Sequence, residues 1–89
     1  MKQYELEFTA QGETEFFSLP GNLQGRIKTK MEFFISSGHP LTFAKKLHGA
    51  ANLYRFRIGD YRVIVTPKDK NTIVILLILK VGHRREAYE

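Results

Sequence analysis

The chain has 89 residues and no cysteine; 43% of the residues are hydrophobic, 26% are charged, and the formal net charge is +5. These values predict one domain over residues 1–89 with a single core, and they exclude disulfides and thiolate metal sites, so we expect a protein of the reducing cytoplasm. A membrane helix is excluded too, because the longest apolar run, Ile73 to Leu79, is far shorter than the roughly 20 residues such a helix needs.

The first half of the chain predicts one strand followed by two helices. Apolar and polar residues alternate over residues 4–8, which is the pattern of a half-buried strand. A short helical turn is expected at residues 13–18. A longer helix is expected at about residues 23–35, where apolar side chains recur at helical spacing. Gly38 and Pro40 then end this second helix.

A hairpin is predicted after a linking stretch over residues 41–52. The segments 53–58 and 61–66 have strand character and flank the pair Gly59-Asp60. Two residues suffice for a tight turn between antiparallel strands, and a glycine in first place favours a type II′ turn. The sequence therefore fixes the expected register of this hairpin.

Three arginines share one surface of the predicted hairpin. In the expected register Arg57 faces Arg62, and Arg55 lies on the same side. Directly opposed side chains are roughly 5 Å apart, and like charges at that distance destabilise a sheet. The three arginines thus indicate a site for an anion. The alternative is an ordinary solvated surface, on which the arginine stems cover apolar neighbours.

The third strand of the second half completes the predicted fold. Residues 67–71 are expected to form a polar connection, and the apolar run 73–79 is typical of a strand buried on both faces at the centre of a sheet. Gly82 is then expected to turn the chain out of the sheet. The order of elements predicts an α+β fold: a small, mainly antiparallel sheet with two N-terminal helices packed on one face and the other face left open.

Positive charge is concentrated in the second half, where residues 45–89 hold ten Lys or Arg against four Asp or Glu, which favours nucleic acid as a partner. Behind the last strand follow His83, Arg84, Arg85 and Tyr88. With the hairpin arginines they predict a metal-free site for a phosphodiester, and the simplest chemistry for such a site is cleavage of RNA. The histidines lack partners at ligand spacing, so neither metal nor cofactor is expected.

The second half of the chain resembles the RelE branch of the RelE/ParE toxin superfamily. The resemblance is carried by LHGAANLYRFRIGDYRVIV at residues 47–65 and TIVILLILKVGHRREAY at residues 72–88. It implies a RelE-like, microbial RNase-like fold and a cognate antitoxin as partner. It also implies an mRNA interferase, that is, a toxin that enters the ribosome and cleaves mRNA in the A site without metal.

Individual residues match the motifs of that family. Arg55 and Arg57 match two basic residues on the strand before the hairpin turn, and Arg62 matches the arginine that follows the turn. The arginine after the glycine and the terminal tyrosine are matched by Arg84 and Tyr88. Many relatives carry lysine where this chain has Arg55 and Arg57, and arginine is a poor proton donor or acceptor. The remaining candidates for proton transfer are Tyr88, His83 and Glu86.

RNA carries its own nucleophile, the 2′-hydroxyl, so an enzyme has to align it, stabilise charge on the phosphoryl oxygens and help the 5′-oxygen leave. Arginine suits the second task because its planar fork grips phosphate oxygens and stays charged. We assign Arg62 and Arg84 to this role and Tyr88 to base stacking or proton transfer. The residues expected to hold the RNA are Arg55, Arg57, Arg85 and Lys80.

Two other functions remain open at the level of sequence. A ParE-like toxin would share the fold but inhibit DNA gyrase as a binding protein, and such relatives generally lack the terminal tyrosine and the full set of arginines. An inactive family member would bind only an antitoxin or nucleic acid. The terminal tyrosine and the full set of arginines are both present here, so the endoribonuclease is favoured over the gyrase inhibitor.

Overall fold

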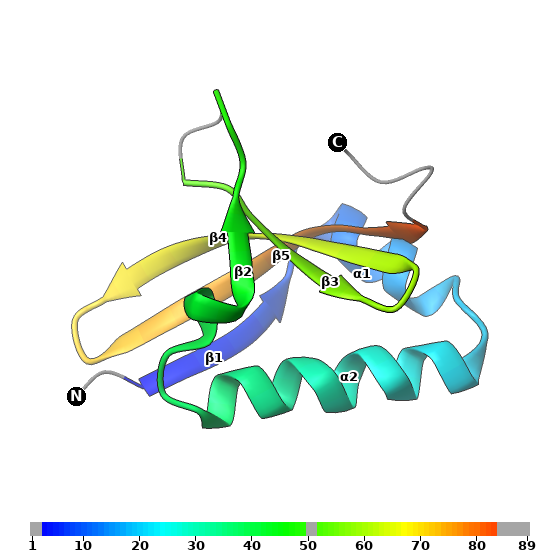
Figure 1. Cartoon of the computed structure of the whole chain (residues 1–89), viewed down its shortest axis with the longest axis horizontal. Coiled ribbons are helices and arrows are strands. Elements are labelled where there is room, and N and C mark those ends of the chain that lie inside the picture. The colour runs from blue at the N-terminus through cyan, green and yellow to red at the C-terminus, as the bar shows by residue number, and fades with distance from the viewer. Residues whose placement is uncertain (1–2, 50–51, 84–89) are drawn as a thin grey trace.

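The computed structural model describes residues 3–49 and 52–83 of the chain (Figure 1). In chain order the elements are β1 (Gln3–Phe8), α1 (Ala10–Phe17), α2 (Gly21–Ser36), the 3-10 helix η1 (Pro40–Phe43), β2 (Ala44–Lys46), β3 (Tyr54–Ile58), β4 (Tyr61–Lys70) and β5 (Ile73–His83). In these residues no helix is both long and apolar enough to cross a membrane.

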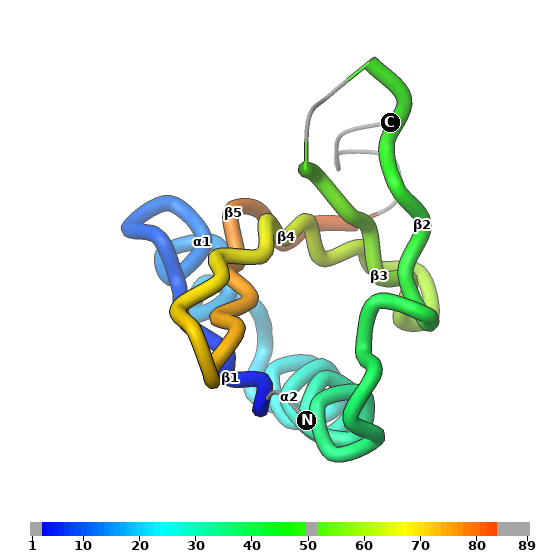
Figure 2. Tube along the Cα trace, turned by 90° about the vertical axis from the view of Figure 1, so that its left-hand side faces the viewer, coloured from blue at the N-terminus to red at the C-terminus, as the bar shows by residue number. Residues whose placement is uncertain are grey.

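The strands form one five-stranded sheet in the order β1-β5-β4-β3-β2. All neighbouring strands are antiparallel except β1, which runs parallel to β5. Viewed from the side, the sheet curves from β1 round to β2, and α2 lies across the opening (Figure 2). The predicted α+β fold, with two helices and a mainly antiparallel sheet, is therefore confirmed.

The core lies between α2 and the concave side of the sheet. Ile27, Met31 and Phe34 of α2 are buried, as are the strand residues that face them. Phe34 stacks on Phe56 of β3 with ring centroids 5.1 Å apart, and α1 adds Phe16 to the same core. The alternating residues of β3, β4 and β5 that complete the core are Phe56, Ile58, Val63, Val65, Val74, Leu76, Ile78 and Val81.

Helix α1 lies at the edge of β5 where β1 has ended. The backbone N–H of Thr9 donates to the carbonyl of Ile78 (3.0 Å), and the Thr9 side chain caps the helix by accepting from the Gly12 N–H (3.0 Å). One turn later the Glu15 carboxylate accepts from the Val81 N–H (2.8 Å). A side chain of α1 thus provides β5 with an acceptor that a neighbouring strand would otherwise supply.

The hairpin between β3 and β4 has the predicted register. Ile58 pairs with Tyr61, and Gly59 has a φ of +59°, the left-handed value that a type II′ turn needs at its first central residue.

The helices begin earlier than predicted, at Ala10 and Gly21.

Two predictions about connecting segments were wrong. Residues 41–52 contain η1 and β2 and are more than a linking stretch. Residues 67–71 are not a connection, because β4 continues to Lys70 and the turn falls at Asn71, which has a φ of +66°. Pro67 is tolerated inside β4 because β3 begins only at Tyr54, which pairs with Val65. Beyond Val65, β4 therefore has no neighbouring strand on the β3 side.

Strand β5 also departs from its prediction. It does not end before Gly82 but continues to His83, and Gly82 pairs with Arg62. It is fully buried on one face only: Val74, Leu76 and Ile78 are buried, whereas the residues between them are half-buried. The face of the sheet opposite α2 is only partly open, because Arg62 and Ile64 on it are buried.

Candidate functional site

Basic side chains from four strands share the face of the sheet opposite α2. Arg57 pairs with Arg62 across the hairpin, and Arg55 pairs with Ile64. On the far side of β4, Ile64 also pairs with Lys80 of β5. On the far side of β3, Lys45 of β2 pairs with Arg55. Directly paired residues point to the same face of a sheet, so we call these five cations, Lys45, Arg55, Arg57, Arg62 and Lys80, the basic face.

The basic face concentrates like charge at short range. Directly paired side chains lie roughly 5 Å apart, and the pairs Lys45–Arg55 and Arg57–Arg62 both join two cations. Lys45 and Arg57 are exposed, and Arg55 and Lys80 are half-buried. The repulsion between these groups is relieved when an anion with several negative charges binds across them.

Arg62 is the most deeply placed member of the basic face. Only 6% of its surface is exposed, and its Nε and Nη1 atoms are buried. The interaction of a guanidinium with an anion is stronger at such a buried position than in water, because the local dielectric is lower. Arg62 pairs with Gly82 on β5. Because glycine has no side chain, no side chain of β5 lies directly beside Arg62 at this pair.

His83 is not brought together with the arginines. It pairs with Tyr61, and the two rings meet edge to face with centroids 5.4 Å apart. Tyr61 packs against the core, and consecutive strand residues point to opposite faces. His83 therefore lies on the other side of the sheet from Arg62, beside the end of α1, where Glu15 and Leu19 line the same hollow.

The predicted site residues Arg84, Arg85, Glu86 and Tyr88 lie outside the described residues. The structure does place the last described residues of β5. Its last pairs are Gly82 with Arg62 and His83 with Tyr61, directly beside the β3–β4 turn. The last described residues of β5 therefore lie at the Arg57–Arg62 end of the basic face.

The sequence did not identify Lys45 as a site residue. Its position depends on β2, a strand of three residues, which is too short to produce a recognisable alternation. The only available signal was its basic character within the charged half of the chain.

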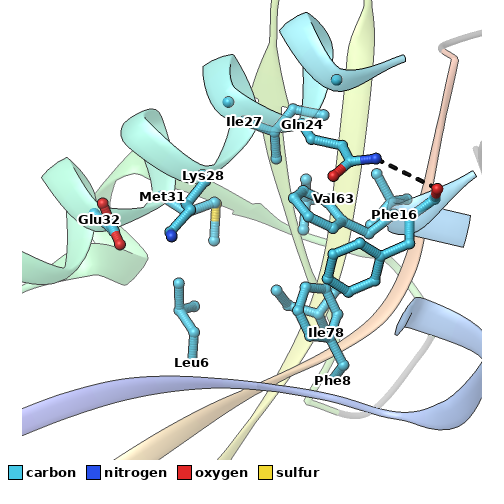
Figure 3. Close-up of a pocket in the computed structure, with 14 residues that line it drawn as sticks. Leu6, Phe8, Phe16, Gln24, Ile27, Lys28, Met31, Glu32, Val63 and Ile78 are labelled. Atoms are coloured by element: carbon cyan, nitrogen blue, oxygen red, sulfur yellow. Dashed lines mark hydrogen bonds between the residues drawn. The ribbon is translucent and has the colours of Figure 1, made fainter. Parts of the chain in front are cut away.

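A groove on the opposite side of the sheet is of a different kind (Figure 3). It has a volume of about 510 Å³ and lies between α2 and the β1 side of the sheet. Gln24 bounds it, and its side-chain amide donates to the Phe17 carbonyl (3.3 Å). The charged side chains at the groove are Lys28 and Glu32. Its remaining lining is mostly apolar and includes Leu6, Phe8, Phe16, Ile27, Met31, Val63 and Ile78. This groove lacks the clustered cations of the basic face.

No three His, Asp or Glu side chains within residues 3–49 and 52–83 are grouped so that they could hold a metal ion.

Comparison with known proteins gives consistent matches over nearly the whole chain. The family model for the ParE toxin of the type II toxin-antitoxin system parDE matches residues 9–88. A chain of the archaeal RelE-RelB complex from Pyrococcus horikoshii OT3 is 30% identical, with a TM-score of 0.68, over 96% of this chain and 99% of that one. A chain of the toxin-antitoxin complex RelBE2 from Mycobacterium tuberculosis is 29% identical, with a TM-score of 0.72, over 92% and 99%.

The isolated RelE toxin of E. coli is similar in fold, with a TM-score of 0.71 at 21% identity, over 90% of this chain and 83% of that one. No curated protein matches the chain.

Proposed function

Because this chain belongs to the RelE/ParE superfamily of toxins from type II toxin-antitoxin systems, we propose that it is an endoribonuclease that cleaves mRNA in the ribosomal A site without a metal. The observation that carries this proposal is the basic face, on which the buried Arg62 of β4 shares one side of the sheet with cations from β2, β3 and β5. A single RNA strand presents a row of phosphates, which fits a row of cations spread across a sheet.

The proposed reaction is attack of a ribose 2′-hydroxyl on the adjacent phosphorus, with departure of the 5′-oxygen. Arg62 stabilises the charge that builds up on the phosphoryl oxygens, and its burial strengthens that interaction. Arg55, Arg57 and Lys80 hold the neighbouring phosphates, since they are more exposed and lie around Arg62 on the same face. By analogy with other preorganised donors, loss of Arg62 should lower the rate by on the order of a hundredfold to a thousandfold.

Arg84, Arg85 and Tyr88 remain proposed site residues. They follow β5 in the sequence, and β5 ends beside Arg62. Arg84 is proposed to share the charge stabilisation with Arg62, Arg85 to bind RNA, and Tyr88 to stack on a base or to transfer a proton. His83 is less suited to proton transfer, because it contacts Tyr61 on the other side of the sheet.

Expression of the toxin in growing cells, followed by mapping of new 5′ ends on translated messages, tests the proposal. Cuts within coding regions are expected, and they should disappear in Arg62→Ala. Because Arg62 is buried, the exposed Arg57→Ala serves as a second variant that leaves the core intact, and Arg26→Ala on α2 is the matched control from the other side of the sheet. New 5′ ends that persist unchanged in both Arg62→Ala and Arg57→Ala would contradict the proposal.

Inhibition of DNA gyrase is the second candidate function, favoured by the ParE description of the matching family model. A gyrase inhibitor would stop growth without new RNA ends and would cause gyrase-linked breaks in DNA. The two activities are therefore separated by assaying RNA and DNA from the same culture.

A cognate antitoxin is the proposed protein partner, because the similar chains from Pyrococcus horikoshii and Mycobacterium tuberculosis come from complexes of toxin and antitoxin. We propose the cytoplasm as the site of action, where ribosomes and mRNA are available. Co-expression with the gene adjacent to the toxin gene, followed by purification through a tag on one protein, tests the partnership: the untagged protein should co-purify in fixed ratio.

A further inference from the structure

A shallow hollow lies within the basic face, over the buried side chain of Ile64. Its volume is about 490 Å³. The apolar part of its lining comes from Ala10, Leu53, Ile64 and Leu79. Thr9, Gln11 and Lys80 contribute polar groups. An apolar hollow of this kind is unusual on a surface that otherwise carries cations.

An irregularity in the β4–β5 ladder builds the hollow. Ile64 pairs with Lys80, but the next residue, Val65, pairs with Ile78, so Leu79 is an extra residue without a partner on β4. In a regular strand Leu79 and Lys80 would point to opposite faces. Here both line the hollow. Bulges commonly redirect a side chain in this way next to functional sites, and this one adds an apolar side chain beside a cation.

Lys80 is the cation that lines the hollow, and two further cations of the basic face lie near Ile64. Ile64 is flanked by Arg55 on β3 and by Lys80 on β5, each directly paired with it. Arg62 precedes Ile64 by two residues on β4 and therefore lies on the same face. The arrangement is an apolar hollow with Lys80 in its lining and with Arg55 and Arg62 near Ile64 on the same face, which suits a nucleotide, with its flat base and its adjoining phosphates.

We propose that this hollow receives one unpaired nucleobase of the RNA strand whose phosphates lie on Arg55, Arg62 and Lys80. The proposal rests on the proposed function, because it takes RNA as the substrate of this face. The base packs against Leu53, Ile64 and Leu79, while the backbone stays at the level of the cations. An apolar side chain of a protein partner would also fit the hollow, but it would bring no phosphate to the cations of this face, so RNA is favoured.

The test measures binding of short single-stranded RNA to the purified full chain. The RNA carries 2′-fluoro sugars, which lack the hydroxyl nucleophile, so binding is observed without cleavage. One abasic sugar is moved along the strand from position to position. The number of phosphates stays constant, so the electrostatic contribution does not change. At one position the abasic sugar should weaken binding roughly tenfold, equivalent to about 1.4 kcal/mol.

Variants of the hollow make the test specific. Leu79→Ala should abolish most of the abasic penalty, because the base loses its contact, and Leu53→Trp should do the same by filling the space. Leu77→Ala is the matched control: Leu77 lies on the same strand, is also half-buried and does not line the hollow. It should keep the full penalty. Urea unfolding of each variant shows that the comparison is made between folded proteins.

An abasic penalty that is equal at all positions, or that survives in both Leu79→Ala and Leu53→Trp, would overturn the inference. So would an absence of RNA binding by the unaltered chain. Weaker antitoxin binding in Leu79→Ala with unchanged RNA binding would assign the hollow to the protein partner instead. Cleavage is measured separately on natural RNA, so a chain that discriminates the abasic position but cuts no message would refute the proposed function and leave the inference standing.

Discussion

Gly12 is predicted to be required where α1 meets β5, and its replacement by alanine should destabilise the protein. A Cβ atom at Gly12 would clash with the carbonyl oxygen of Ile78, a backbone atom. Contacts below 3.0 Å are essentially never observed for a real Cβ, so α1 has to move away from β5. That movement disturbs the two hydrogen bonds from Thr9 to the Ile78 carbonyl (3.0 and 3.1 Å) and the bond from Val81 to Glu15 (2.8 Å).

The expected magnitude follows from these contacts. Loss of two or three hydrogen bonds at about 1 kcal/mol each is offset by the roughly 1 kcal/mol that alanine contributes over glycine within a helix. The net loss of unfolding free energy is therefore about 1–2 kcal/mol. For a domain of this size it corresponds to a fall in Tm of roughly 4–16 °C, at about 4–8 °C per kcal/mol.

Gly25→Ala is the matched control, because Gly25 also lies within a helix but a Cβ there has nothing within 4 Å. This substitution should stabilise the protein by about 1 kcal/mol. Urea unfolding followed by circular dichroism measures both changes. The reasoning is refuted if Gly12→Ala proves as stabilising as Gly25→Ala, since the packing of α1 against β5 would then tolerate a methyl group.

Three further predictions concern the hairpin and the basic face. Gly59→Ala should lower the free energy of unfolding by about 1–2 kcal/mol, because Gly59 has a φ of +59° and a left-handed backbone strains residues other than glycine. Thermal unfolding measures this change, and an unchanged Tm would contradict the prediction. Lys45→Ala should weaken binding of single-stranded RNA. In a salt titration it should reduce the slope of log affinity against log salt concentration by about 0.7, the value for one phosphate contact. A slope equal to that of the unaltered chain would show that Lys45 does not contact the RNA. Arg62→Lys should keep the positive charge but lose bidentate contact with phosphate. The cleavage rate should therefore fall well below that of the unaltered chain, while RNA affinity changes less. Equal cleavage rates for both proteins would exclude a geometric role for the guanidinium.

The hairpin and its arginines could be predicted from sequence because a two-residue turn determines the register of the two strands that it joins. Once Ile58 faces Tyr61, the alternation of a strand places Arg55, Arg57 and Arg62 on one side. The structure has this register. A short turn and a period of two are local properties, and local properties are visible in a sequence.

The remaining parts of the site depend on contacts between distant segments. Lys45 joins the basic face only because a strand of three residues pairs with β3. His83 was grouped with the arginines because Gly82 was expected to end the strand, whereas one more pair in the ladder places His83 beside Tyr61. The hollow over Ile64 depends on the extra residue Leu79, which no apolar pattern distinguishes from its neighbours.

The pairing of β1 with β5 has a consequence for the synthesis of this protein. Gln3 lies beside Ile73, so β1 is held in place by a strand that is synthesised much later than β1 itself. At about 5–20 residues per second, β1 waits roughly 4–14 s for its neighbour. Until β5 emerges, Arg62 has no strand beside it on one side, and the newly made chain cannot display the assembled cations to the ribosome that is producing it.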